Sequence, residues 1–381
     1  MQKIINGKIL TPYPLPDGFG ILIDGEKIIK VEPADDFPDP IRTIDARGQW
    51  VIPGLIDIHI HGSHGHDTME DDPQALPKIS RFLASKGVTS FLPTTVTAPD
   101  QQILKVIEHI RQYPNQNMGA RLLGVHLEGP YLNAQYRGAQ PVEYLRTAQP
   151  EEYLPWLETG LIKLMTVAPE IDGVLALIKT GIEMGVKFAV GHSNASYERV
   201  EQAVKYGLNQ STHTFNAMPP LHHRQPGVVG AVLSDDRIYA QVIADGVHLH
   251  PAVVSLLFKA KGIANTILIT DAMQAAGAAD GIHQLGAQDI TVLDGIARTK
   301  SGALAGSTLT LNDALRNSSN FTGLPWQELL PSATLIPAKS LDLENQIGVI
   351  KEGAFADIVI MDQHLSPQLT ILAGKIVFAG A

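Results

Sequence analysis

The chain contains no cysteine in its 381 residues. Disulfide bonds and thiolate metal ligands are therefore excluded, and any bound metal ion must be held by histidine and carboxylate side chains. The sequence also lacks an apolar run long enough to cross a bilayer, and its first residues lack the long apolar core of a signal peptide. We therefore expect a cytoplasmic protein with no membrane association.

The chain has fewer basic than acidic residues. The chain has 29 lysines and arginines against 39 aspartates and glutamates, which gives a formal net charge of −10 at pH 7. This balance argues against a nucleic-acid partner and against an anionic membrane. A small anionic substrate remains possible if a local cationic pocket receives it. Because the chain is longer than a typical single domain, we expect one large barrel or two domains.

Both ends of the chain have the pattern of short strands separated by turns. The pair Asp24-Gly25 between two apolar runs is a hairpin signal. Residues 5–9 and 372–376 have similar sequences, Ile-Asn-Gly-Lys-Ile and Leu-Ala-Gly-Lys-Ile. We therefore predict one small β-sandwich built from residues 1–50 and 348–381, with two unrelated strand clusters as the alternative.

Residues 51–347 alternate apolar strands with amphipathic helical stretches, which is the pattern of a parallel sheet. Eight strand–helix units predict an α/β fold, a (β/α)8 TIM-like barrel whose chemistry lies at the C-terminal ends of the strands. An open doubly wound sheet is the alternative. The candidate strands are Leu55–Ile60, Val88–Leu92, Leu122–Leu127, Ile162–Val167, Lys187–Val190, Gln210–His213, Ala240–Ala244 and Thr266–Thr270.

Polar residues follow the ends of five of these strands. The first strand ends in His59 and His61, and period-two geometry puts both imidazoles on one face. A single histidine on an apolar strand is usually structural, but a barrel would gather all five strand ends into one ring. Imidazole and carboxylate ligands suit zinc or another borderline divalent ion. The other members of the ring are His126, Glu128, His192, His213 and Asp271.

Asp271 stands alone after the eighth strand and is the candidate catalytic residue. A divalent metal lowers the pKa of bound water and polarises a carbonyl group. A carboxylate that is not saturated by ligation can take the proton of the water and pass it to a leaving amine. The alternative is that Asp271 caps the N-terminus of a following helix.

Several segments of the barrel carry a resemblance to known proteins. They are His126–Asn133, Gly191–Ala195, Thr212–Pro220, Ile243–His248 and Leu304–Leu309. With these segments the chain resembles the amidohydrolase superfamily, and within it the family of N-acetylglucosamine-6-phosphate deacetylases, over essentially its whole length. The sequences Glu-Gly-Pro and Phe-Asn-Ala-Met-Pro-Pro are the specific ones, whereas His-x-His is shared by the whole superfamily.

The resemblance implies a metal-dependent hydrolase of amino-sugar catabolism and recycling. Its substrate would be N-acetyl-D-glucosamine 6-phosphate, and its products D-glucosamine 6-phosphate and acetate. One alternative is an N-acetylgalactosamine-6-phosphate deacetylase or another cyclic amidohydrolase. A second alternative is an inactive sugar-phosphate sensor on the same fold. The partners would be a small amino-sugar phosphate and a second copy of the chain in a homodimer.

The resemblance also implies a metal ion held by Glu128, His192 and His213. Because His59 and His61 are retained, the chain resembles those members that can hold two ions. We therefore expect one or two divalent ions, with zinc favoured over iron and manganese. Many superfamily members bridge two metals with a carboxylated lysine, but no lysine stands at the corresponding strand end here, so Glu128 would be the bridge.

Substrate contacts implied by the resemblance come from several loops. Asn216 and Ala217 would present polar groups to the sugar phosphate. Arg224 would bind the phosphate through its paired donors, and in this family it can reach the active site of a neighbouring subunit. The other implied substrate residues are Ala139, Gln140, His248, Leu304, Ala305 and Gly306.

One position departs from the family pattern. The family usually has Lys-Gly-Ala-His where this chain has Arg-Gly-Ala-Gln at residues 137–140. The amide of Gln140 can donate a hydrogen bond to the substrate carbonyl but cannot be cationic. We hypothesise that this change is linked to the retained His59 and His61, because a metal there would leave the carbonyl less dependent on a cation. The change could also indicate the galactosamine epimer as substrate.

Overall fold

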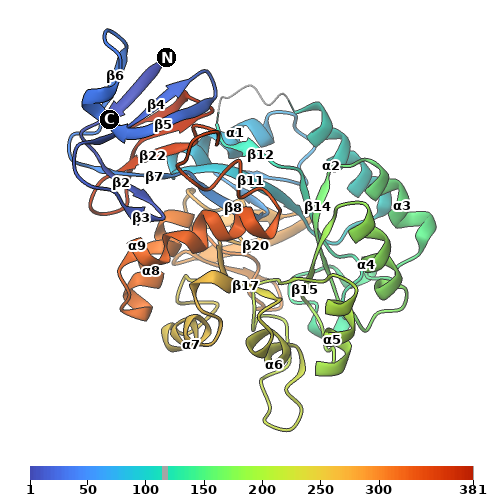
Figure 1. The fold of residues 1–381 in the computed structure, drawn as a ribbon. Helices are drawn as coiled ribbons and strands as arrows, with labels where there is room; N and C mark the ends of the chain where they lie inside the picture. Colours follow the sequence, from blue (N-terminus) through green and yellow to red (C-terminus); the bar gives the residue numbers. More distant parts are fainter. Residues whose placement is uncertain (114–118, 381) are drawn as a thin grey trace.

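Eight parallel strands form the centre of the structure, which is a computed structural model describing residues 1–113 and 119–380. Each strand pairs with its neighbour in the order β8-β11-β13-β14-β15-β16-β17-β18. The strands are β8 (Leu55–Ile60), β11 (Val88–Thr95), β13 (Val125–Glu128), β14 (Ile162–Val167), β15 (Lys187–Val190), β16 (Gln210–Ser211), β17 (Tyr239–Ile243) and β18 (Thr266–Ile269). The predicted (β/α)8 barrel is confirmed (Figure 1).

All eight predicted strands are present, but some of their ends are shifted. The predicted third strand, Leu122–Leu127, is divided into β12 (Arg121–Leu122) and β13, because Gly124 lies between them with a φ of 146°. The predicted sixth strand, Gln210–His213, is wrong at its end, because His213 leaves the strand with a φ of 28°. The side chain of His213 therefore stands on a turn, whereas Glu128 is the last residue of β13 and stands on the sheet itself.

The barrel closes between the first strand, β8, and the last, β18. The hydroxyl of Thr270 donates to Asp57 Oδ2 at 2.6 Å, and the backbone N–H of Asp271 donates to the carbonyl of His59 at 2.9 Å. Ile60 and Ala272 form a parallel bridge just beyond. This seam places His59 and Asp271, which are distant in the sequence, side by side at the mouth of the barrel.

Amphipathic helices cover the outside of the barrel (Figure 1). Helix α1, for example, buries Leu76, Ile79 and Leu83, which recur at helical spacing on one face. The helices are α1 (Ala75–Ser85), α2 (Asp100–Gln112), α3 (Pro150–Glu158), α4 (Val174–Glu183), α5 (Tyr197–Lys205), α6 (Gly227–Ser234), α7 (Pro251–Lys261), α8 (Leu311–Thr322), α9 (Trp326–Leu329) and α10 (Leu335–Ser340). Within the described residues, no helix combines the length and the apolar character needed to cross a membrane.

The two ends of the chain build a small β-sandwich, as predicted. One sheet has the order β5-β4-β1-β6, and the other, β24-β23-β22-β7-β2-β3, mixes strands from both termini. In Figure 1 the blue and red strands lie together beside the barrel. The N-terminal strands are β1 (Gln2–Ile5), β2 (Lys8–Thr11), β3 (Tyr13–Pro14), β4 (Phe19–Asp24), β5 (Lys27–Pro33), β6 (Arg42–Asp45) and β7 (Trp50–Pro53). The C-terminal strands are β22 (Ile358–Met361), β23 (Pro367–Leu372) and β24 (Lys375–Ala379).

The predicted hairpin at Asp24-Gly25 joins β4 to β5, with Asp24 paired to Lys27. The division of the chain at residues 50/51 and 347/348 stays a prediction. In the structure β7 pairs with β22, so residues 50–53 belong to the sandwich sheet and the barrel begins after them. Ala381, the last residue of the predicted C-terminal segment, lies outside the described residues.

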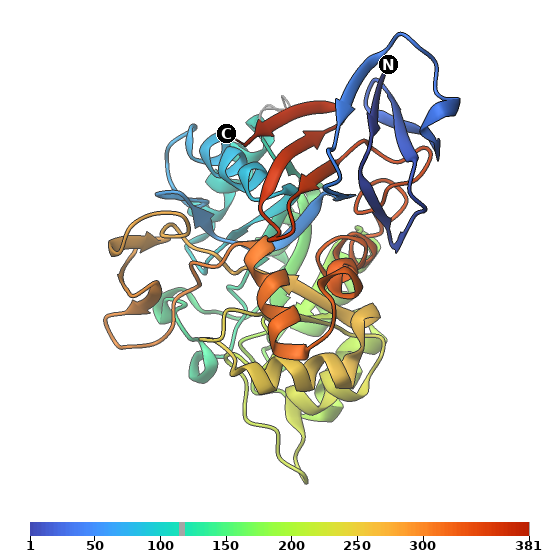
Figure 2. The ribbon, with the colours of Figure 1, turned by 90° about the vertical axis from the view of Figure 1, so that its left-hand side faces the viewer.

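A three-stranded antiparallel sheet follows the last barrel strand and was not predicted. It consists of β19 (Gly281–Leu285), β20 (Gln288–Leu293) and β21 (Ile296–Thr299). The pair Asp294-Gly295 between β20 and β21 is a hairpin signal of the same kind as Asp24-Gly25, and it could have revealed this insertion. The sheet projects from the mouth of the barrel (Figure 2).

Candidate metal centre

Side chains from five strand ends converge at the C-terminal mouth of the barrel, the end at which barrels of this kind carry their chemistry. The strands β8, β13, β15, β16 and β18 each contribute. All of the converging residues are at least nine-tenths buried. They are His59, His61, Glu128, His192, His213 and Asp271. The structure therefore brings together every predicted metal ligand and the predicted catalytic aspartate.

Glu128, His192 and His213 form the first group of candidate ligands. Glu128 Oε1 lies 3.1 Å from Nε2 of both histidines, and the two Nε2 atoms are 3.0 Å apart. An ion bonded at about 2.0–2.2 Å in tetrahedral geometry separates its ligand atoms by roughly 3.3–3.6 Å. The measured separations are close to this value, so the three side chains fit a single ion.

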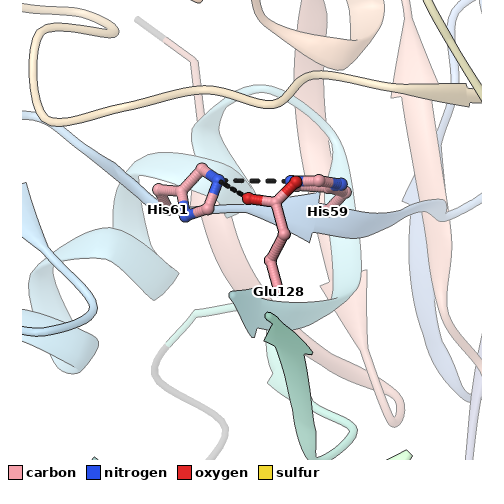
Figure 3. Close-up of side chains that lie close together, drawn as sticks. All are labelled: His59, His61 and Glu128. Carbon is pink, nitrogen blue, oxygen red and sulfur yellow. Dashed lines mark hydrogen bonds and ion pairs between the residues drawn. The ribbon is translucent and has the colours of Figure 1, made fainter. Parts of the chain in front are cut away.

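His59, His61 and the same Glu128 form the second group (Figure 3). The two histidine Nε2 atoms are 3.2 Å apart, and Glu128 Oε2 lies 3.3 Å from His61. Asp271 Oδ1 adds a further oxygen, 3.3 Å from His59 Nε2 and 3.2 Å from His61 Nε2. Glu128 Oε2 faces His61, whereas Oε1 faces His192 and His213 and is also the oxygen nearest His59 Nε2, at 3.7 Å. Because Glu128 belongs to both groups, its carboxylate could be shared by two ions.

Hydrogen bonds at Nδ1 of His61 and of His192 fix these two rings in the tautomer that binds metal. His61 Nδ1 lies 3.2 Å from the carbonyl of Thr94, and His192 Nδ1 lies 3.0 Å from the carbonyl of Tyr136. A carbonyl can only accept, so each Nδ1 carries a proton and each Nε2 points into the centre, where a metal ion could replace any proton on it. This tautomer is the one required of a neutral metal-binding imidazole.

The buried charges of the centre favour a cation. Burial alone would lower the pKa of His61, but hydrogen bonds to Asp271 and Glu128 raise it to about 10. Burial opposes ionisation of both carboxyl groups, yet His59 and its neighbouring histidines hold the pKa of Glu128 and of Asp271 well below the usual range. Two ionised carboxylates in a buried site require positive charge, and a divalent ion would supply it.

Three of the converging residues have a backbone conformation that is uncommon outside glycine. The φ angles of His192, His213 and Asp271 are 48°, 28° and 49°. Such angles carry conformational strain and are frequent at functional sites. Here they turn the chain sharply after a strand and direct each side chain into the mouth. The residues after Asp271 form turns rather than a helix, so the alternative role of Asp271 as a helix cap is wrong.

His126 lies in the ring predicted from the sequence but does not face the centre. Its Nε2 lies 2.7 Å from Thr166 Oγ1 and its Nδ1 lies 3.3 Å from Thr94 Oγ1, so both nitrogens have protein partners. Burial lowers its pKa well below the usual value, which keeps the ring neutral. The ring packs edge-on against His59 with the centroids 4.6 Å apart. His126 therefore supports a candidate ligand instead of being one.

A cavity of about 220 Å³ opens over the centre. It is walled by the loops that follow several barrel strands, together with Leu285 of the three-stranded sheet. Ala305, between Leu304 and Gly306, is fully buried and does not line the cavity. The predicted substrate residues that line the cavity are Ala139, Gln140, Asn216, Ala217, His248, Leu304 and Gly306.

Arg224, the predicted phosphate contact, does not line this cavity. It is exposed on the loop between Phe215 and α6. That loop extends away from the barrel at the bottom of Figures 1 and 2. Within one chain, Arg224 is therefore not brought to the candidate site.

The sequence did not single out some residues that shape the site. Asp245 Oδ2 lies 2.7 Å from His248 Nδ1, and although burial lowers the pKa of His248, this carboxylate raises it above the usual value. Gln288 donates to the carbonyl of Ala139 at 2.7 Å, which ties the three-stranded sheet to the cavity wall. The spacing Asp-x-x-His could have indicated the first pair.

Residues 50–377 match the Amidohydrolase family. The chain belongs to the amidohydrolase family. It is 39% identical to an N-acetylglucosamine-6-phosphate deacetylase of Bacillus subtilis (strain 168), over 86% of this chain and 84% of that protein. It is also 38% identical to an N-acetylgalactosamine-6-phosphate deacetylase of Escherichia coli O157:H7, over 89% of this chain and 90% of that protein.

The fold agrees equally well with a solved amidohydrolase structure. The crystal structure of N-acetylglucosamine-6-phosphate deacetylase from Pasteurella multocida superposes with a TM-score of 0.94, at 31% identity and with complete coverage of both chains. The resemblance inferred from the sequence segments is thus confirmed. The amidohydrolase family is metal-dependent, which agrees with the two ligand groups around Glu128.

We predict that Glu128→Gln removes metal and activity together. The amide is uncharged and keeps one carbonyl oxygen, so it cannot bridge two groups of histidines. Losing a side chain that merely hydrogen-bonds to a ligand typically costs about 10–100-fold, so losing the bridge should cost more than about 100-fold in turnover. Metal per chain and turnover are measured on the same preparation. Glu108→Gln on the exposed face of α2 is the matched control, and full activity in chelator-stripped wild-type protein would contradict a metal-dependent site.

Proposed function

We propose that this amidohydrolase hydrolyses the acetamide of N-acetyl-D-glucosamine 6-phosphate to D-glucosamine 6-phosphate and acetate, in amino-sugar catabolism and recycling. The observation that carries the proposal is the pair of ligand groups that share Glu128 beneath a small cavity. The names of the similar proteins, which are deacetylases of amino-sugar phosphates, support the same class of substrate.

The buried side chains of the centre would hold one or two divalent ions, zinc first, with iron or manganese as alternatives. Such an ion supplies Lewis-acid activation of a water molecule and of the acetamide carbonyl. Glu128, His192 and His213 would hold one ion, and His59 and His61 would complete the second site with Glu128. Because these residues exclude bulk solvent, their electrostatic interactions with a substrate are stronger than in water.

Asp271 would move the proton. Its Oδ1 lies beside both His59 and His61, and the residue also lines the cavity, so its carboxylate borders both the metal ligands and the substrate space. It would take the proton of the attacking water and deliver it to the nitrogen of the departing amino sugar, which leaves as a neutral amine. Because Asp271 lies beside His59 and His61, its ionised carboxylate could also offer an oxygen to an ion held there before it takes the proton.

The phosphate group would be bound at the cationic side of the cavity. Asp245 keeps His248 protonated more readily than a free imidazole, and His248 lines the cavity. In a chain of net charge −10, a second cation is needed near a phosphate. We propose that Arg224 provides it in the cavity of a second subunit, because its loop projects from its own barrel (Figure 2). The protein would then be a homodimer, and its cytoplasmic location stays a prediction.

Two alternative functions can be tested by experiment. The galactosamine epimer is one, since relatives named for either epimer are similarly identical to this chain. An inactive sensor is the other, but the ligands and Asp271 are all in place, which favours an enzyme.

We expect kcat/KM for acetate release to be at least about tenfold higher with N-acetylglucosamine 6-phosphate than with its galactosamine epimer, a difference of ~1.4 kcal/mol. The reverse preference would assign the galactosamine substrate, and no acetate from either would indicate a sensor.

We predict that Asp271→Asn keeps the fold and the metal but loses turnover. An amide cannot accept the water proton, so kcat should fall by about 10²–10⁴, the usual contribution of a general acid–base group. Thermal unfolding and metal content are measured alongside kcat. A variant with nearly normal turnover would show that Asp271 does not move the proton.

Arg224→Ala is expected to discriminate between phosphorylated and unphosphorylated substrates. Loss of a charge-assisted hydrogen bond should cost about 1.5–3 kcal/mol in kcat/KM for N-acetylglucosamine 6-phosphate. Unphosphorylated N-acetylglucosamine, a poor substrate, should be almost unaffected. Arg237→Ala, which removes an exposed arginine paired with Asp235, is the control. Equal losses on both substrates would mean that Arg224 stabilises its loop and does not bind the phosphate.

A further inference from the structure

The oxygen and the nitrogen of the Gln140 side-chain amide both form hydrogen bonds in the buried wall of the cavity. Gln140 Oε1 accepts a hydrogen bond from the backbone N–H of Thr97 at 2.7 Å, and Gln140 Nε2 donates to Glu128 Oε2 at 2.6 Å. The residue is only 4% exposed. Because a backbone N–H can only donate, the contact with Thr97 determines which end of the amide faces Glu128.

The hydrogen bond from Gln140 reaches one particular oxygen of Glu128. That oxygen, Oε2, is the one 3.3 Å from His61 Nε2. The other oxygen, Oε1, lies 3.1 Å from Nε2 of both His192 and His213 and receives nothing from Gln140. Gln140 therefore contacts the carboxylate oxygen that faces His61, whereas His59 Nε2 lies nearest the other oxygen, at 3.7 Å.

We propose that Gln140 is a positioning residue that holds Glu128 in its bridging orientation and thereby sets the affinity of the ion site made with His59 and His61. The terminal torsion of a glutamate side chain is broad, so an unrestrained carboxylate can rotate and offer both oxygens to one ion. One lone pair of Oε2 is directed to Gln140, and the other is left for an ion beside His61. This inference rests on the proposed metal-dependent function.

The chemistry of an amide suits this position. A neutral donor orients the carboxylate without placing a positive charge next to two divalent ions, whereas a cation there would repel them. Gln140 also lines the cavity, but its hydrogen bond to Glu128 directs the amide nitrogen to the metal ligand. The structure thus assigns the main effect of Gln140 to Glu128 and not to the substrate carbonyl.

The loop that carries Gln140 is held by contacts that do not involve its side chain. Arg137 Nη1 donates to the carbonyl of Gln140 at 3.0 Å, and Gln288 Nε2 donates to the carbonyl of Ala139 at 2.7 Å. The Gln140 side chain can therefore be changed while these main-chain contacts remain. Methionine has a similar length and volume but no N–H group, which makes Gln140→Met the sharpest variant.

The test measures metal uptake by the full-length enzyme without substrate. The protein is dialysed against buffers of graded free Zn²⁺, and zinc per chain is determined. Wild type should take up two ions. In Gln140→Met, one ion should keep its affinity within about threefold, while the other weakens by about 10–100-fold, the usual effect of losing a side chain that hydrogen-bonds to a metal ligand. Turnover should fall at limiting zinc and return to within about tenfold of wild type at excess zinc.

Two controls separate positioning from packing. When His59→Ala and His61→Ala have removed the second site, Gln140→Met should cause no further loss of affinity for the remaining ion. Gln288→Met removes the hydrogen bond to Ala139 but keeps the contacts of Gln140 with Thr97, Arg137 and Glu128. Because these contacts hold the Gln140 amide, both zinc affinities should be unchanged. Thermal unfolding of each variant reports whether the fold is intact.

Several results would overturn the proposal. They are uptake of a single ion by wild type, equal weakening of both ions in Gln140→Met, or the same loss in Gln288→Met. A fall of about 10²–10³ in kcat at every zinc concentration, with both affinities unchanged, would instead make Gln140 a donor to the substrate carbonyl. Because uptake is measured without substrate, these results are distinguishable from a failure of the deacetylase assignment.

Discussion

The shared carboxylate of Glu128 is the interaction on which the rest of the site depends. A buried carboxylate is unfavourable unless it is paired, and here four histidines and one amide surround it. They keep its pKa well below the usual range although burial opposes ionisation. The ionised group would in turn bind a cation shared with the histidines around it. One residue at the end of β13 thus links the two groups of histidines.

The barrel brings strand ends from distant parts of the sequence together around the Glu128 carboxylate. The seam between β8 and β18 sets His59 beside Asp271 through a backbone hydrogen bond, and Asp57 anchors the seam below them. Left-handed turns after β15, β16 and β18 then direct the side chains inward. Packing of the buried strands offsets the conformational strain of these turns, so the candidate ligands are positioned by rigid elements.

Local patterns made much of this predictable. Alternation of apolar strands with helices indicated the barrel, and polar residues after those strands indicated the ligands and Asp271. The rest depends on contacts that no local pattern encodes. His126 has the sequence context of a ligand, yet both of its ring nitrogens are hydrogen-bonded, to the hydroxyls of Thr94 and Thr166. The insertion that supplies Leu285 to the cavity was missed, and the projection of Arg224 away from its own site follows only from the folded chain.

The most direct test of the account is anomalous diffraction from crystals of the zinc-loaded enzyme, recorded at the zinc absorption edge. We expect two anomalous peaks on either side of the Glu128 carboxylate, roughly 3.5–4 Å apart, as in other two-metal sites. One peak should lie beside His192 and His213, and the other beside His59 and His61. A peak that the Glu128 carboxylate does not coordinate, or no second peak at saturating zinc, would contradict the central role of this bridge.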